Sequence, residues 1–116
     1  MGRQYTFRDL IDVTRTVVRE FDAVERRPWT VETVMIELMK QVGDLSRRVL
    51  TMEQYYLADR DRRPEYETSA SEIGDELADI LYCVIRIAAR YDVDLEHAFL
   101  EARRGELAYL GKDTPI

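Results

Sequence analysis

The sequence predicts an all-α protein, a bundle of four helices joined by short connections. Apolar residues recur at helical spacing in four separate stretches, and residues that commonly cap helices stand directly before them. The 116 residues include only three Pro and five Gly, which leaves little room for long irregular tracts. A chain of this length forms one domain with a modest core, so we expect residues 1–116 to be a single domain completed by dimerisation.

The first predicted helix covers residues 7–26. Thr6 is a good N-cap residue, and Asp9 lies in the first turn, where the helix dipole favours a negative charge. Pro28 and Trp29 interrupt the apolar pattern, so the helix should end near Arg26. Its apolar stripe consists of Phe7, Leu10, Ile11, Val17, Val18, Phe21 and Val24, with Thr14 as one polar member.

The second predicted helix begins after Thr30 and runs to about Thr51. Glu32 lies near its N-terminus, where a negative charge is favourable. Residues 52–68 lose the periodicity and contain Pro64 among mixed charges, which predicts a loop. The apolar stripe of the helix consists of Val34, Leu38, Val42, Leu45 and Val49.

Two further helices are predicted in the C-terminal half. Ser69 followed by Glu72 has the spacing of a capping box, and the helix it opens should reach about Tyr91. Asp94 is a suitable cap for the last helix, and Gly111 is a suitable stop. We expect the tail, residues 112–116, to fray.

Composition excludes several classes of function. The formal net charge of −6 opposes binding to nucleic acid or to an anionic membrane. No apolar run approaches the roughly 20 residues that span a bilayer, and the N-terminal residues lack the apolar region of a signal peptide, so we expect a cytoplasmic protein. The single cysteine, Cys83, excludes an internal disulfide and is expected to be a small buried hydrophobe.

The most informative feature is an acidic strip on the third predicted helix. Glu72, Glu76 and Asp79 are spaced three or four residues apart, so they share a face that borders the apolar stripe Ile73, Leu77, Ile80, Val84 and Ile87. Carboxylates held together beside a core repel each other unless they are hydrated, protonated, paired with Lys or Arg, or bound to a divalent cation.

The second helix repeats this arrangement with Glu37, Gln41 and Asp44. If the two helices pack antiparallel, the two strips can meet along one seam. Oxygen ligands of this kind suit Mg²⁺ or Mn²⁺. The alternative is that both strips are solvated flanks of amphipathic helices.

With these residues the chain resembles the MazG-like nucleoside triphosphate pyrophosphohydrolases, all-α proteins whose signature is EExxE on one helix and ExxD on the next. Glu76-Leu77-Ala78-Asp79 matches ExxD, within the segment DELADILYCVIRIAARYDVDLEHA. The resemblance covers residues 7–101. It implies a homodimer or dimer of dimers that hydrolyses a nucleoside or deoxynucleoside triphosphate to the monophosphate and pyrophosphate. It also implies catalytic roles for Glu76 and Asp79, and a Mg²⁺ or Mn²⁺ ion held by Asp44, Glu76 and Asp79 with support from Glu37 and Gln41.

The chain departs from the family pattern in two places. The residues Lys40-Gln41-Val42-Gly43-Asp44 stand where EExxE is expected, so only the last acid remains, as Asp. Gln offers an oxygen without charge, and Lys40 would repel a cation if it pointed into the site. The family's phosphate-binding residues on the last helix are also missing.

Other residues can compensate for these losses or be unrelated to them. Arg103 and Arg104 either supply positive charge for phosphates or are surface groups, and Trp29 either stacks on a base or plugs the core. A second hypothesis is therefore a catalytically impaired nucleotide-binding or protein-interaction module. A third is a structural helical dimer whose acids only confer solubility.

Overall fold

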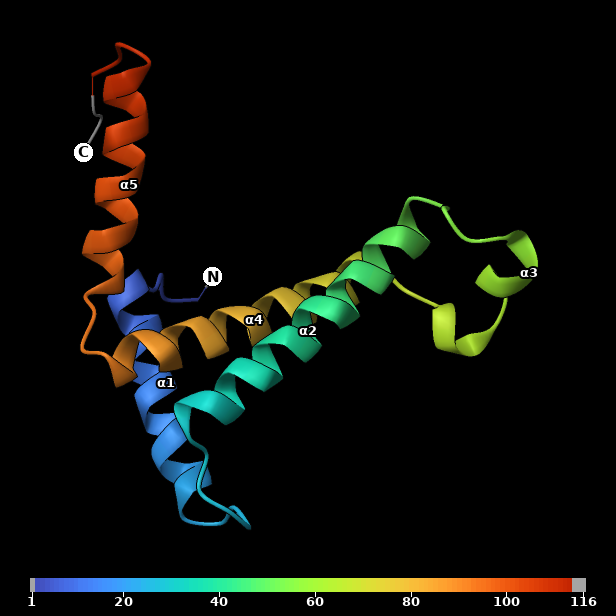
Figure 1. Ribbon diagram of the computed structural model, residues 1–116, viewed down its shortest axis with the longest axis horizontal. Coiled ribbons are helices and arrows are strands. Elements are labelled where there is room, and N and C mark those ends of the chain that lie inside the picture. The colour runs from blue at the N-terminus through green and yellow to red at the C-terminus, as the bar shows by residue number, and fades with distance from the viewer. Residues whose placement is uncertain (1, 114–116) are drawn as a thin grey trace.

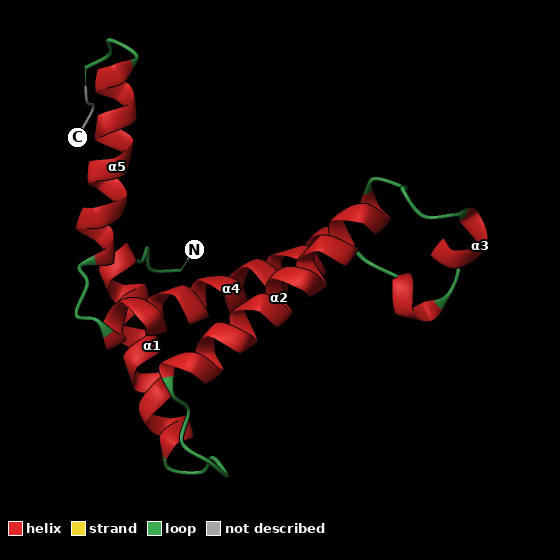
Figure 2. Ribbon diagram, viewed as in Figure 1, coloured by secondary structure: helices red, strands yellow, loops and turns green. Residues whose placement is uncertain are grey.

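The computed structural model describes residues 2–113, and all regular structure within this range is helical (Figure 1, Figure 2). This confirms the predicted all-α class. Two short elements lie in the connection between the second and third long helices. The sequence did not predict them, because segments of three or four residues are too short to show a periodic pattern. The elements are α1 (Phe7–Asp22), α2 (Val31–Met52), α3 (Ala58–Asp61), the 3₁₀ helix η1 (Pro64–Tyr66), α4 (Ala70–Arg90) and α5 (Leu95–Tyr109).

Capping residues fix the N-termini of α1 and α2. The Thr6 hydroxyl accepts a hydrogen bond from the Asp9 amide at 3.1 Å, and the Asp9 carboxylate accepts one from the Thr6 amide at 2.9 Å. Thr30 and Thr33 form the same reciprocal pair at the start of α2. The end of α1 was predicted too late, since the helix stops at Asp22 and Val24 lies beyond it with 75% of its surface exposed.

The C-terminal helices begin as the sequence predicts, with one difference. Ser69 accepts a hydrogen bond from the Glu72 amide at 3.3 Å, but the Glu72 carboxylate binds Arg48 instead of completing the capping box. Asp94 caps α5 by accepting from the His97 amide at 3.0 Å. Gly111 follows the end of α5 with φ of 72°, the left-handed conformation typical of a helix stop. Residues 114–116 of the expected fraying tail lie outside the described residues.

The helices α2 and α4 lie antiparallel along each other, and α1 crosses α4 near its C-terminal end (Figure 1). α5 extends away from this group and does not run alongside α2 or α4 (Figure 1). The apolar side chains that become buried are few: Val34, Cys83 and Ile85. Several members of the predicted stripes stay exposed within one chain, including Phe21, Val49 and Leu77.

None of the helices within residues 2–113 combines the length and the apolar character needed to cross a bilayer.

The capping box of α1 makes a pH-dependent contribution to stability. The hydrogen bond from the Thr6 amide is the main cause that lowers the pKa of Asp9 below its ordinary 3.8. A carboxyl with a lowered pKa in the folded state stabilises the fold fully above its unfolded pKa, and this contribution disappears as the pH falls through the folded pKa. We therefore expect Asp9→Ala to be less stable than the wild type at pH 6 and the difference to shrink towards pH 3. Urea unfolding at both pH values measures this, and a difference that grows on acidification would contradict it.

Candidate functional site

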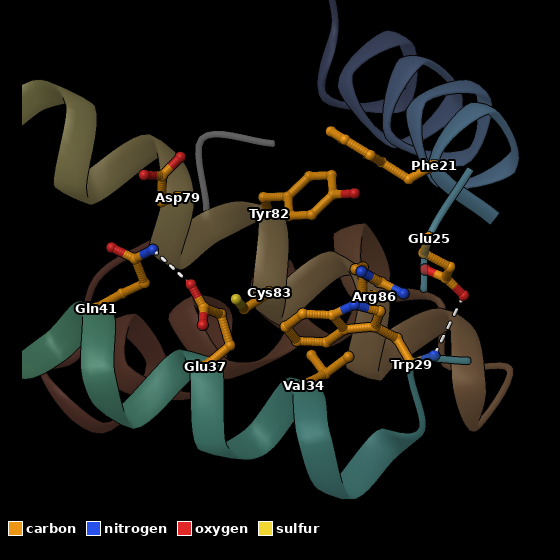
Figure 3. Close-up of a pocket in the computed structure, with 10 residues that line it drawn as sticks. All are labelled: Phe21, Glu25, Trp29, Val34, Glu37, Gln41, Asp79, Tyr82, Cys83 and Arg86. Carbon is orange, nitrogen blue, oxygen red and sulfur yellow. Dashed lines mark hydrogen bonds between the residues drawn. The ribbon is translucent and has the colours of Figure 1, made fainter. Parts of the chain in front are cut away.

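A cavity of about 310 Å³ lies between α2, α4 and the connection that follows α1 (Figure 3). The packing of the helices explains its position. Because α2 lies antiparallel to α4, the acidic edges of the two helices face each other. The connection between α1 and α2 then lies along the remaining side. The lining residues are Phe21, Glu25, Trp29, Val34, Glu37, Gln41, Asp79, Tyr82, Cys83 and Arg86.

One end of the cavity carries oxygen ligands from both helices. The buried Gln41 donates from Nε2 to Glu37 Oε1 at 2.9 Å, which leaves the Gln41 carbonyl oxygen without a part in this bond. Asp79 lies opposite them on α4 (Figure 3). The structure thus brings three of the five predicted metal-site residues to one cavity.

The other end of the cavity is aromatic and carries one cation, Arg86, and one carboxylate, Glu25. The Arg86 guanidinium lies 5.8 Å from the centre of the Trp29 ring and 5.7 Å from that of Tyr82 (Figure 3). The Trp29 amide donates to the Glu25 carboxylate at 3.3 Å, which fixes the backbone beside the indole. Trp29 remains 43% exposed, so its ring borders the cavity and is not enclosed as a core plug.

Asp44 and Glu76, the two other predicted metal ligands, do not line this cavity. Asp44 Oδ2 lies 3.6 Å from Lys40 Nζ, and Glu37 Oε1 lies 3.9 Å from the same nitrogen. The Lys40 side chain is 62% exposed and does not line the cavity either. It neutralises these acids from the solvent side.

Glu76 pairs with Arg48, a residue that was not among the predicted site residues. Its Nε lies 3.1 Å from Glu76 Oε1, and its Nη1 lies 2.6 Å from Glu72 Oε2. The hydrogen bond to Glu76 is the main cause that raises the pKa of Arg48. Arg48 lies one turn after Asp44 on the same edge of α2 as Glu37 and Gln41. Helical spacing alone therefore indicates that Arg48 faces the same seam as these residues.

Glu76 retains one unused oxygen. Only 12% of its side chain is exposed, and its Oε2 is buried without a hydrogen-bond partner among the described residues. Within residues 2–113, no three side chains of His, Cys, Asp or Glu converge closely enough to hold a metal ion by themselves. The acids of the two strips are therefore neutralised largely by pairing, which is one of the outcomes expected for crowded carboxylates.

The predicted phosphate-binding residues of the last helix lie elsewhere. Arg103 pairs with Glu106, and Arg104 pairs with Glu101 at 2.8 Å, both within α5. Neither arginine lines the cavity.

Cys83 lines the cavity, but its thiol is a poor nucleophile. Its surface is 3% exposed, and burial is the main cause that raises the pKa of its thiol. A thiol with a raised pKa has little of the thiolate form that acts as a nucleophile. This confirms the expectation that Cys83 is a small buried hydrophobe.

Comparison of the chain with protein-family models, with curated proteins and with solved structures gives no match.

Proposed function

We propose that this chain is a Mg²⁺-dependent nucleoside or deoxynucleoside triphosphate pyrophosphohydrolase, producing the monophosphate and pyrophosphate. One observation carries the proposal: a single cavity has an indole with a guanidinium at one end and carboxylate and amide oxygens at the other. A nucleotide has the matching polarity, with an aromatic base at one end and phosphates that need cations at the other. The resemblance to MazG-like enzymes supplies the reaction.

The base would stack on Trp29. Every nucleobase has a π face, and stacking on an aromatic side chain contributes about 1–3 kcal/mol per base. Arg86 already approaches this ring and can add a cation–π contribution or a hydrogen bond to the base or sugar. Stacking of this kind tolerates many bases.

The residues present fit a Mg²⁺ or Mn²⁺ ion that is shared with the substrate. All candidate donors are oxygens, and the buried Glu76 Oε2 lacks a partner that a cation would provide. Magnesium is commonly held by one or two carboxylates, several waters and substrate phosphates, so a preformed cluster of three acids is not required. Asp79 would be the carboxylate that the cavity itself offers to the ion, with Glu37 and Gln41 in support. Glu76, one turn away on α4, would approach the ion from outside the lining residues. Asp44 would contribute to the negative potential from outside the cavity.

The bound ion would neutralise the triphosphate and lower the pKa of a coordinated water. The protein's own residues perform the remaining tasks. Within residues 2–113, Asp79 has no Lys or Arg within 4.0 Å, so its carboxylate is available to accept a hydrogen bond from water. Gln41, held by Glu37, can fix the position of a phosphate or of a metal-bound water across the cavity.

The test is pyrophosphate release from a panel of standard and modified triphosphates with Mg²⁺ or Mn²⁺. We expect metal-dependent release by the wild type and a loss of at least about 100-fold in Asp79→Asn, the scale typical of a positioned acid or base. Asp75→Asn, an exposed carboxylate on the same helix outside the cavity, is the matched control and should retain activity. If the wild type releases pyrophosphate no faster than Asp79→Asn does, the proposed pyrophosphohydrolase activity is excluded.

A second candidate is a MazG-like module that binds nucleotides without turnover. Arg48 and Lys40 favour it, because they already neutralise acids that a catalytic metal would use. Trp29 is the only tryptophan, so quenching of its fluorescence by a triphosphate reports binding directly. Quenching without pyrophosphate release would select this candidate.

We also propose that the chain forms a homodimer, or a dimer of dimers, that completes the helical bundle. Its radius of gyration is 17.9 Å, against about 13 Å for a compact domain of this length. Its accessible surface is 9314 Å², roughly 2,700 Å² above the usual value for a monomer of this mass. The exposed residues Met35, Ile36 and Met39 of α2 supply an apolar surface for a second copy.

A further inference from the structure

A second cavity, of about 320 Å³, lies between α1, α4 and the start of α2. It adjoins the first cavity, since Trp29, Val34 and Arg86 line both. Four arginines line it: Arg15 and Arg19 from α1, and Arg86 and Arg90 from α4. None of the described residues that line it carries a carboxylate.

These arginines form two pairs of like charge. The members of each pair are four residues apart on one helix, a spacing at which like charges destabilise the helix by a few tenths of a kcal/mol. The cavity then sets the α1 pair against the α4 pair. Four positive charges are therefore gathered in one place on a chain whose formal net charge is −6.

Carboxylate partners do not offset this concentration of charge. Within residues 2–113, none of the four arginines lies within 4.0 Å of a carboxylate, whereas Arg8, Arg48 and Arg104 all have such partners. Arg19 makes only a long hydrogen bond, 3.4 Å, to the Thr16 hydroxyl.

Glu32 is an acid whose pKa is affected by one arginine of this cluster. The hydrogen bond from its own backbone amide is the main cause that lowers its pKa, Thr30 adds to it, and the charge of Arg90 has a smaller effect. Glu32 therefore serves the N-terminus of α2, and its side chain does not line the cavity. Glu25 of the adjoining cavity is a second acid near Arg86, and the two negative charges still leave the four arginines with an excess of positive charge.

We infer that this cavity binds an oligophosphate, an anion with two or three linked phosphate groups. Guanidinium groups form paired, charge-assisted hydrogen bonds with phosphate oxygens, and four of them suit an anion carrying several negative charges. The apolar floor formed by Val18, Val34 and Ile85 excludes part of the water, which strengthens the attraction. The oligophosphate is either a free inorganic chain or the phosphate tail of a nucleotide other than the one proposed to be hydrolysed in the first cavity. The inference does not depend on the proposed hydrolysis.

The test is calorimetric titration with tripolyphosphate in EDTA, so that no divalent metal contributes. We expect wild-type binding that weakens as salt is added, and an affinity about 10- to 100-fold lower in the double variant Arg15→Gln/Arg19→Gln, from the loss of two charge-assisted contacts. Arg62→Gln/Arg63→Gln removes the same charge from exposed positions outside the cavity and should change the affinity less than threefold. Circular dichroism checks folding, and Arg90→Gln alone, on the other helix, must weaken binding in the same direction.

Two results would overturn the inference: no tripolyphosphate binding at low salt and millimolar ligand, or equal weakening in both double variants. Tripolyphosphate binding in EDTA requires neither a metal nor turnover, so failure of this site and failure of the proposed hydrolysis are distinguishable. Tighter binding of ATP than of tripolyphosphate would identify the ligand as a nucleotide tail. Equal affinities would identify a free oligophosphate.

Discussion

Replacing Arg48 with Met is expected to lower the free energy of unfolding by about 2–3 kcal/mol. Removing one partner of a buried pair leaves an uncompensated charge, at a cost of about 3–5 kcal/mol, and the partial exposure of Arg48 and Glu72 reduces this figure. Glu76, with only 12% of its side chain exposed, is the acid left without a partner. Met preserves the packing of the Arg48 stem, so the effect reports the charge. Urea unfolding at pH 7 measures it.

Arg47→Met is the matched control for this variant. Arg47 is the neighbouring residue on α2, and it donates to the backbone carbonyl of Glu65 in the α2–α4 connection and pairs with no acid within residues 2–113. Its replacement should cost less than about 1 kcal/mol, the usual net value of one hydrogen bond. Adding Glu76→Gln to Arg48→Met should restore part of the loss. Equal destabilisation by Arg47→Met and Arg48→Met would show that the Glu76 pair is unimportant.

Arg48→Met also bears on the proposed metal. Without its guanidinium, Glu76 depends on another cation, so Mg²⁺ should raise the melting temperature of the variant more than that of the wild type.

The double variant Ile36→Glu/Met39→Glu is expected to prevent formation of the proposed dimer and to leave a monomer. Ile36 is 69% exposed and Met39 is 64% exposed, and both project from α2 on a surface that the single chain leaves uncovered. Burying two carboxylates in an apolar interface without partners costs several kcal/mol, enough to shift the dissociation constant by 100-fold or more. Light scattering coupled to size-exclusion chromatography should give a mass near 13.7 kDa for the variant and at least twice that for the wild type.

Val24→Glu is the control for this experiment. Val24 is even more exposed, at 75%, but it lies in the connection after α1 and not on α2. This variant should keep the mass of the wild type. A wild-type chain that remains monomeric at 100 μM would refute the dimer and leave the apolar surface of α2 without an occupant.

Local patterns in the sequence predict the helices and most of their ends. Thr6, Thr30, Ser69 and Asp94 cap the helices that they were predicted to cap, and Gly111 follows the last of them. Hydrogen bonds between residues three or four apart set these features, so the information is local. The acidic strips were also readable, since helical periodicity alone places their members on one edge.

The packing of the helices against one another sets which charged side chains form pairs. Arg48 reaches Glu76 across 28 positions of sequence, and Asp79 shares a cavity with Glu37 and Gln41 because α4 lies antiparallel to α2. The arginines of α1 and α4 share a cavity because those helices cross. Helical spacing fixes neighbours along one helix, but the angle and register at which two helices pack depend on every side chain in the contact. For this reason the acids could be identified from the sequence, but their partners could not. In the fold, Asp79 and Glu37 line the cavity, whereas Glu76 forms an ion pair with Arg48.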